Sequence, residues 1–533
     1  MVNKSSIAVV WFKRDLRSSD HAALAAAVAT GLPVVPLYIV EPDYWQGPDT
    51  SARQYEFTCE CLVELREELA KLGQPLIVRQ GDVVATLARL NRQHKISVLF
   101  AHEETGNDWT FARDKKVMAW ARHAEVPFHE FAQNGVIRRM VSRDGWAARF
   151  DETMAQAQIA IPVLKPLTDA GIDIDPGQIP TAQDLNLADD FCPGRQTGGR
   201  KAALAELGKF LTMTGLPYRR AMSSPVTGAL HCSRLSPHLA YGTLSIREVT
   251  QAGIARLSQL KGDPSPEAAE WRGSMVSFLS RLHWRDHFTQ KLEDQPAIEF
   301  QALHPHFRHR DNRKASKAAL LAWQTGTTGI PFVDACMRSL NQTGWINFRM
   351  RAMLVSFASH LLDLPWRSTG LHLARQFTDY EPGIHWSQVQ MQSGLTGINT
   401  VRIYNPIKQG LEHDAGGSFI RRWVPELRDA PTAFLHDPWL EFGLLETKPA
   451  DYPAPIIHVA SAMRAARERL HAPRKTTEFN KVNDAIQAKH GSRRAGLKQT
   501  DKIAFTKRKE QAAKRASAPK KAEAQDDLFN PIR

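Results

Sequence analysis

Hydroxyl, guanidinium and backbone amide groups come together in the segment 231–245, which reads HCSRLSPHLAYGTLS. Ser233, Arg234 and Ser236 stand directly ahead of a short stretch of helical character. Small hydroxyls and free N–H groups at the start of a helix can bind a phosphate or another anion. The same residue types are also ordinary helix caps. The segment therefore predicts either an anion site or simple capping, and its residues leave both open.

A second candidate site combines arginines on a helix with acidic residues on a loop. Arg349 and Arg351 lie in the otherwise apolar stretch GWINFRMRAML. A buried arginine needs a carboxylate or a phosphate as its partner. About thirty residues later, Asp379 and Glu381 occur beside a proline, which places them on a loop. The pattern predicts either a polar ligand site or a salt bridge between helices.

Other clusters of reactive side chains favour ordinary structural roles. His304, His306 and His309 do not have the spacing of a zinc motif. Cys59 and Cys61 would point to different faces of a helix, as core thiols do. The sequence also lacks a Gly-x-Ser-x-Gly nucleophile motif. We therefore expect no metal site and no covalent nucleophile.

Two regions of different hydrophobic periodicity must position these residues. In residues 1–135, five apolar runs alternate with helical stretches, which predicts a parallel five-stranded sheet covered on both faces. The runs cover 7–12, 33–40, 75–78, 98–101 and 126–131, and the helices 21–30, 51–72, 82–94 and 107–123. Between 201 and 471 the period is near 3.6, which predicts a large all-α domain. Its helices are expected at 202–213, 245–260, 271–292, 315–324, 332–342 and 347–364.

The remaining residues divide into a connector and a tail. Residues 136–200 are rich in Pro, Gly, Asp and Gln and predict an interdomain connector. Residues 472–533 form a basic extension, expected to be part helix and part disordered. The first turn of the α/β domain, FKRDLR, lacks the glycines of a dinucleotide fingerprint, so this Rossmann-like domain is not expected to cradle a pyrophosphate.

Composition excludes several classes of protein. The 533 residues are 43% apolar and carry a net charge of +13. No apolar run approaches the ~18 residues of a spanning helix. The five scattered cysteines argue against a disulfide scaffold and favour a cytoplasmic location. Residues 491–533 hold twelve Lys/Arg and five Asp/Glu, so over half of the excess charge lies in the tail. Such a tail predicts salt-dependent DNA affinity, with a merely solubilising tail as the alternative.

A series of motifs resembles the photolyase/cryptochrome family. VVWFKRDLRSSDHAAL is followed, in the family's order, by TGLPYRRAM, SRLSPHLAYGTLS, LHWRDHF, TGTTGIPFVDACMRSLNQTGWI, TDYEP and VRIYNPIKQG. The resemblance covers residues 5 to about 445. It implies an α/β antenna domain and a helical domain that holds FAD. The implied activity is light-driven repair of a flipped pyrimidine dimer in UV-damaged DNA by a monomer, with a second antenna chromophore of unknown identity as a further expectation.

The resemblance also assigns roles to single residues of this sequence. It places flavin ribose and pyrophosphate contacts at Tyr218, Ser233, Arg234, Leu235 and Ser236. Arg351 and Asp379 match the family's ion pair beside the isoalloxazine ring, and Glu381 stands where an aspartate meets the ring edge. Trp284 and Arg285 match the residues that face the dimer and the DNA side of the cavity.

Several positions depart from the dimer-repairing members. Arg281 replaces a glutamate that holds the dimer, while Phe348 and Ala352 replace an asparagine and a methionine near the bases. His385 replaces the asparagine near flavin N5, and a histidine there is expected to titrate near neutral pH. These changes leave two interpretations: a different pocket for the same repair, or a cryptochrome-like blue-light photoreceptor without repair.

Electron transfer and the antenna are also affected. Of the family's three relay tryptophans Trp366 remains, with Val389 and Arg313 at the other two places and Trp386 or Trp284 as candidate substitutes. Thr110 stands where a glutamate contacts a folate antenna, so a folate antenna is doubtful.

The end of the tail offers one more hypothesis. Gln525, Leu528 and Phe529 lie in QDDLF, which is similar to the QxxLF peptides that dock on bacterial sliding clamps. A Leu-Phe pair can anchor in an apolar pocket. The tail therefore predicts a sliding clamp as a partner.

Overall fold

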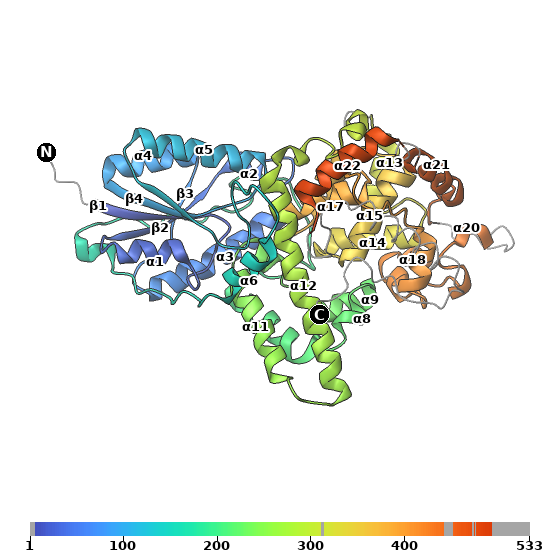
Figure 1. The fold of residues 1–533 in the computed structure, drawn as a ribbon, viewed down its shortest axis with the longest axis horizontal. Helices are drawn as coiled ribbons and strands as arrows, with labels where there is room; N and C mark the ends of the chain where they lie inside the picture. The colour runs from blue at the N-terminus through green and yellow to red at the C-terminus, as the bar shows by residue number, and fades with distance from the viewer. Residues whose placement is uncertain (1–5, 311–313, 442–450, 472–473, 475, 493–533) are drawn as a thin grey trace.

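The computed structural model describes residues 6–310, 314–441, 451–471, 474 and 476–492. An α/β domain and a large helical region lie side by side, and the long helix α12 (Pro266–Asp294) runs between them (Figure 1). Within the described residues, no helix has both the length and the apolar character that a membrane span requires.

The α/β domain contains the expected parallel five-stranded sheet. Its strands are β1 (Ser6–Phe12), β2 (Val34–Val40), β3 (Ile77–Gln80), β4 (Lys95–His102) and β5 (Phe128–Phe131). They are ordered β3-β2-β1-β4-β5, and every pair is parallel. β1 is central, and its buried residues pack alternately on two cores. The predicted fold of this domain is therefore confirmed.

Helices cover both faces of this sheet. α1 (Ala22–Ala29) and α3 (Ala52–Lys71) pack on one face, while α4 (Val83–Gln93) and α5 (Asp108–His123) pack on the other (Figure 1). Each of α1, α4 and α5 begins at a residue whose side chain accepts a backbone N–H of the first turn, as N-caps do: His21, Asp82 and Asn107. The sequence therefore specifies these helix starts locally.

The connector is mostly irregular and runs along both domains. It contains α6 (Trp146–Ala155) and a single 3₁₀ turn at Leu167–Ala170. Leu164 N–H donates to the carbonyl of Leu72 at 2.8 Å, and Gly194 N–H donates to the carbonyl of Gln342 at 2.9 Å. Because its backbone groups are paired in this way, the connector is tied to each domain in turn.

The helical region begins with short helices and continues with longer ones. They include α7 (Arg200–Lys209), α8 (Tyr218–Ala221), α9 (Pro225–His231), α10 (Ser236–Ala240), α11 (Ile246–Gln259), α13 (Lys317–Thr325), α14 (Pro331–Thr343), α15 (Phe348–Ser356), α16 (Trp366–Gln376) and α17 (Pro382–Gln392). α17 packs against α12 and α15. The periodicity predicted the long helices but not α16 and α17.

The described part of the C-terminal extension packs on the helical region. Helix α22 (Thr477–His490) carries Phe479, whose ring stacks on His304 with centroids 4.0 Å apart. At its other end, His490 Nε2 lies 2.8 Å from Gln295 Oε1. Gln525, Leu528 and Phe529 lie outside the described residues, so the sliding-clamp hypothesis stays a prediction.

Candidate functional site

A cavity of about 350 Å³ opens in the helical region, within the size range of cofactor pockets. Its walls come from α8, α10, α12, α15, α17 and the loops beside them. Every residue predicted for cofactor or substrate binding lies in these walls: Tyr218, Ser233, Arg234, Leu235, Ser236, Arg281, Trp284, Arg285, Arg351, Asp379, Glu381 and His385. Segments far apart in sequence are thus brought to one cavity, whereas Trp366 lies outside its walls.

The wall around α10 has a constrained backbone. Arg234 adopts a φ of 56°, in the left-handed region that costs a non-glycine residue free energy. Its guanidinium carbon lies 4.0 Å from the centre of the Trp345 ring. Arg234 Nε donates to Gln196 Oε1 at 3.1 Å, and Gln196 Nε2 donates back to the Arg234 carbonyl at 2.9 Å. Gln196, which carries no sequence signal, therefore holds Arg234 from the connector.

A bidentate ion pair forms part of the opposite wall. Arg351 donates from Nη1 to Asp379 Oδ1 at 3.0 Å and from Nη2 to Oδ2 at 2.8 Å. Its guanidinium carbon also lies 4.1 Å from the centre of the Phe377 ring. The sequence pattern predicted either a salt bridge or a polar ligand site. Both interpretations apply, because the two residues of the salt bridge also line the cavity. Such planar, doubly bonded pairs hold their geometry well.

Arg285 is bound by protein carboxylates. Its Nη2 donates to Glu381 Oε2 at 2.9 Å, and its Nη1 donates to Asp286 Oδ1 at 2.8 Å. Burial disfavours the charged guanidinium, but these two carboxylates outweigh it and raise the pKa of Arg285. Arg285 therefore stays charged and fixes Glu381, and the role at the DNA side of the cavity that the resemblance implied for it stays a prediction.

Aromatic and cationic side chains line another part of the cavity. Trp284 stacks on Phe288 with ring centroids 5.6 Å apart. Phe348 lines the cavity and is 40% exposed. Arg281 Nη2 lies 3.5 Å from Met222 Sδ. Tyr218 is buried, and burial raises the pKa of its hydroxyl to about 12. This wall offers flat apolar surfaces beside a guanidinium.

His385 is buried and neutral. Its Nε2–H donates to the carbonyl of Gly370 at 2.9 Å, because a carbonyl can only accept. Burial lowers the pKa of the ring to about 4. The expectation that His385 titrates near neutral pH is therefore wrong, since desolvation outweighs this hydrogen bond. The tautomer leaves Nδ1 as a hydrogen-bond acceptor.

A pair of tryptophans lies behind His385. Trp366 is 2% exposed, and its ring meets Trp386 edge to face at 5.9 Å. Trp386 in turn meets His385 at 5.0 Å. Val389 lines the cavity, whereas Arg313 lies outside the described residues. Trp386 thus contacts both Trp366 and His385 of the cavity wall, and a substitute electron relay through Trp386 stays a prediction.

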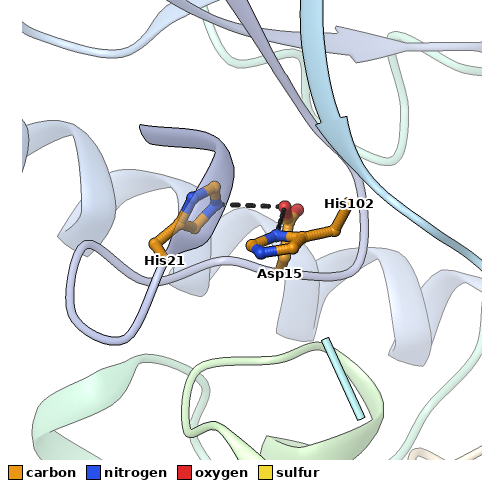
Figure 2. A group of neighbouring side chains, drawn as sticks. All are labelled: Asp15, His21 and His102. Carbon is orange, nitrogen blue, oxygen red and sulfur yellow. Dashed lines mark hydrogen bonds and ion pairs between the residues drawn. The ribbon is translucent and has the colours of Figure 1, made fainter. Parts of the chain in front are cut away.

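A buried cluster of Asp15, His21 and His102, with no signal in the sequence, lies at the carboxyl end of β1 (Figure 2). Asp15 Oδ2 lies 2.8 Å from His102 Nδ1 and 3.0 Å from His21 Nε2. His21 Nδ1 accepts the N–H of Leu24 at 3.0 Å, so Nε2 carries the proton in the neutral ring and has no lone pair for a cation. The donor set therefore fits a hydrogen-bonded cluster and not a metal centre.

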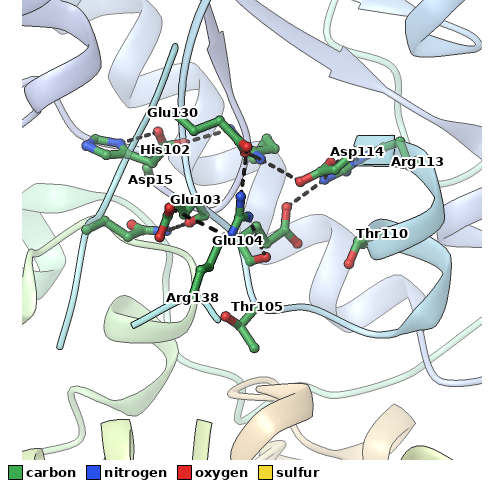
Figure 3. A network of polar contacts seen from close by, with 12 residues as sticks. Asp15, His102, Glu103, Glu104, Thr105, Thr110, Arg113, Asp114, Glu130 and Arg138 are labelled. Atoms are coloured by element: carbon green, nitrogen blue, oxygen red, sulfur yellow. Dashed lines mark hydrogen bonds and ion pairs between the residues drawn. The ribbon is translucent and has the colours of Figure 1, made fainter. Parts of the chain in front are cut away.

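An ionic network fills the crevice between β1 and β4, where the strand order reverses (Figure 3). Open α/β sheets commonly bind ligands at such a point. Here Arg113 Nη2 lies 2.6 Å from Glu104 Oε2 and 2.9 Å from Asp114 Oδ1, while Lys13 Nζ lies 2.9 Å from Asp114 Oδ2. Only about 30 Å³ remains open. A cavity of this size is smaller than the pockets that usually hold aromatic cofactors.

Thr110 plays a structural part at the start of α5. Its N–H donates to Asn107 Oδ1 at 3.1 Å, and its hydroxyl donates to the Asn107 carbonyl at 3.0 Å. The residue is 3% exposed. A separate cavity of about 590 Å³ lies between α5, residues 138–143 and the end of α12. That cavity is large enough for an aromatic ligand.

Comparisons with known proteins follow the same division of the chain. The family model described as DNA photolyase matches residues 8–145, and that described as FAD binding domain of DNA photolyase matches residues 278–472. The deoxyribodipyrimidine photo-lyase of Streptomyces griseus is 29% identical over 484 residues, which cover 87% of this chain and 99% of that protein.

Two further relatives come from different branches. The cryptochrome DASH of Natronomonas pharaonis is 27% identical over 491 residues, which cover 85% of this chain and 98% of that protein. The crystal structure of a bacterial class III photolyase from Agrobacterium tumefaciens gives a TM-score of 0.72 at 26% identity and covers 89% of this chain and 99% of that one.

Proposed function

Because the chain belongs to the photolyase/cryptochrome family, we propose that it is a DNA photolyase that splits a pyrimidine dimer with an electron from light-excited, reduced FAD. The observation that carries this proposal is the single cavity that gathers all the predicted flavin and lesion residues. The 40% exposure of Phe348 supports it further, because a residue of the cavity wall is thereby in contact with solvent.

The donor set of the cavity fits FAD. Ser233, Ser236 and Arg234 would bind the pyrophosphate and ribose, since hydroxyls and a guanidinium are donors that phosphate oxygens need. The Arg351–Asp379 pair would lie beside the ring system, with Glu381 held by Arg285 at its edge. When bound and reduced, FAD supplies the electron; binding and orientation come from the protein.

The aromatic wall would receive the lesion. A dimer leaves the duplex to reach the active site, and aromatic side chains replace the stacking it loses. Trp284 and Phe348 offer such surfaces. Arg281 brings donors where repairing relatives have a carboxylate, so it would bind dimer carbonyls or a phosphate. We propose that these three residues form a different pocket for the same task.

A cryptochrome-like photoreceptor without repair activity is the second candidate. Its support is the charge reversal at Arg281, together with the capture of Arg285 by Glu381, which takes one cation away from the DNA side. In this case the cavity and FAD would serve light detection, and the pocket residues would have no lesion to bind.

Light-dependent repair of defined lesions separates the two candidates. Purified, chemically reduced protein is mixed with oligonucleotides that carry a cyclobutane dimer or a 6-4 photoproduct, in light and in darkness. Repair of either lesion only in light supports the photolyase and names its substrate. Absence of repair by protein with photoreducible FAD rejects the photolyase and favours the photoreceptor.

Two partner proposals accompany the main one. The cavity of about 590 Å³ is where we would expect a second antenna chromophore, because the crevice of the α/β sheet is filled. Absorption bands besides those of flavin in the purified protein would support this. UV-damaged DNA is the proposed macromolecular partner, and the binding constant should fall as salt rises.

A further inference from the structure

Side chains of the α/β domain bind a run of backbone carbonyls in the helical region, between the end of α16 and Glu381. The acceptors are the carbonyls of Ala374, Arg375, Gln376, Phe377 and Tyr380. Gln54 Nε2 donates to residues 374 and 377 at 2.7 and 2.9 Å, Ser51 Oγ to residue 375 at 2.8 Å, and Arg53 Nη1 to residue 376 at 3.1 Å. Arg14 Nη2 donates to residue 380. The last carbonyls of a helix need such external donors.

Arg14 differs from the other donors because it contacts two walls of the cavity from behind. Its Nε donates to the carbonyl of Ala240 at 2.9 Å, at the end of α10. α10 begins at Ser236 in the wall predicted to bind the pyrophosphate. Tyr380, its other acceptor, stands between the two acidic residues of the opposite wall. One guanidinium therefore links both walls.

The charge of Arg14 also faces the acidic wall. Arg14, Arg285 and Glu381 line a small polar cavity of about 30 Å³ between the two domains. Burial disfavours the charged form of Arg14, but Glu381 and nearby phenols outweigh burial and raise its pKa. Glu381 thus has two partly buried cations beside it, Arg285 in direct contact and Arg14 nearby.

The loop that presents Arg14 is held in place on its own domain. Asp15 Oδ1 accepts the N–H of Lys13 at 2.6 Å. The other carboxylate oxygen, Oδ2, contacts the rings of His21 and His102 (Figure 2). On the far side, the loop presses on Gly242, where a Cβ would lie 2.3 Å from the Arg14 carbonyl. The position of Arg14 is therefore determined by contacts on both domains.

We propose that Arg14, from the α/β domain, is a positioning residue of the flavin site that holds the loop carrying Asp379 and Glu381 against α10 and contributes positive charge beside it. This rests on the proposed function in that the cavity is taken to hold FAD. The α/β domain then has a task besides that of an antenna, since it completes the cofactor site.

The test uses three variants of the full chain: Arg14→Met, Arg14→Lys and the control Arg17→Met. Arg17 lies on the same loop, is more deeply buried than Arg14 and donates to the Gly242 carbonyl at 3.0 Å, but it does not bond to residues 379–381. The readouts are the Kd of FAD by titration of the apoprotein, the flavin midpoint potential, and the urea stability of the apoprotein.

We expect Arg14→Met to weaken FAD binding about tenfold and to shift the midpoint potential to more negative values, because a buried charge-assisted donor and a cation are lost. Arg14→Lys should restore the potential but only part of the affinity, since one ammonium cannot bind both carbonyls as a guanidinium does. Arg17→Met should lower only the stability of the apoprotein.

The proposal would be overturned if Arg14→Met had the same FAD affinity and midpoint potential as the wild type. It would also be overturned if Arg17→Met changed these two quantities as much as Arg14→Met, because the effect would then come from general contact between the domains. If Arg14→Met does not fold, the FAD affinity of Arg14→Lys becomes the test. An FAD affinity of Arg14→Lys equal to that of the wild type would overturn the proposal. Neither flavin readout uses DNA. A chain that binds FAD and repairs no lesion contradicts the proposed function and leaves these expectations unchanged.

Discussion

Arg285 Nη2 and Glu381 Oε2 lie 2.9 Å apart and join α12 to the loop that precedes α17. The contact makes Glu381 part of a buried ionic group that includes Asp286, whose pKa burial raises. The acidic side chain at the predicted flavin edge is thereby paired with the guanidinium of Arg285.

Replacement of Glu381 by Gln is expected to raise the flavin midpoint potential. The substitution leaves the cation Arg285 without this carboxylate, so added electron density on the flavin is stabilised. Spectroelectrochemical titration measures the shift. Glu412→Gln, which removes an exposed partner of Lys408, is the matched control and should leave the potential unchanged. Equal potentials in Glu381→Gln and the wild type would contradict this prediction.

Replacement of Asp379 by Asn should lower both the FAD content of the purified protein and its stability to unfolding. It breaks a bidentate pair and leaves the partly buried Arg351 without its carboxylate, a loss of about 2 kcal/mol. Urea unfolding and the FAD content of the purified protein test this. Full FAD content together with unchanged unfolding would show that the pair has no role in the site.

His385 should make the folded state less stable in acid. Its pKa is lowered from 6.5 to about 4 by burial, so the unfolded chain binds a proton that the folded chain refuses as pH falls below 6.5. The loss grows to about 3 kcal/mol near pH 4. Urea unfolding at several pH values should show a shallower decline in His385→Gln, which keeps an amide donor for Gly370. If stability fell with pH equally in the wild type and in His385→Gln, the predicted contribution of His385 would be contradicted.

Photoreduction of FAD should depend on the tryptophan pair. Trp386→Phe and Trp366→Phe are each expected to slow light-driven reduction of oxidised FAD at least tenfold, because they remove redox-active rings in edge contact. Absorbance during illumination with an external reductant gives the rate. Trp120→Phe on α5 in the α/β domain is the control, and chemically reduced protein should retain repair in all three. Unchanged photoreduction in both pair variants would place the electron route elsewhere.

Phe348 should contribute to lesion binding by stacking. Phe348→Ser is expected to weaken binding of dimer-containing DNA about tenfold or more, because a base–aromatic stack is worth about 1–3 kcal/mol. Binding of undamaged DNA should change little. Phe191→Ser, which removes a 77% exposed ring from the connector, serves as the control. Equal affinity of the Phe348 variant and the wild type for damaged DNA would exclude a stacking role.

Local patterns in the sequence were enough for the sheet, the longer helices and the membership of most site residues. Alternating apolar runs predict strands wherever a domain buries a parallel sheet, and N-caps such as Asp82 and Asn107 mark helix starts. The ordered motifs predicted Ser233, Arg351 and Asp379 through the family resemblance, and the structure places all three in the wall of one cavity. The strands and the helix starts depend on neighbours within a few residues, and such neighbours can be read from one chain.

The tertiary structure alone decided which partners those residues have. Three hydrogen bonds join residues that are far apart in the sequence. Arg234 bonds to Gln196, 38 residues away, and Arg285 bonds to Glu381, 96 residues away. Arg14 bonds to the carbonyl of Tyr380, 366 residues away. The neutral state of His385 likewise depends on burial by distant helices. No local rule predicts such pairs, because they arise only when distant segments of the chain pack together and their buried polar groups need partners.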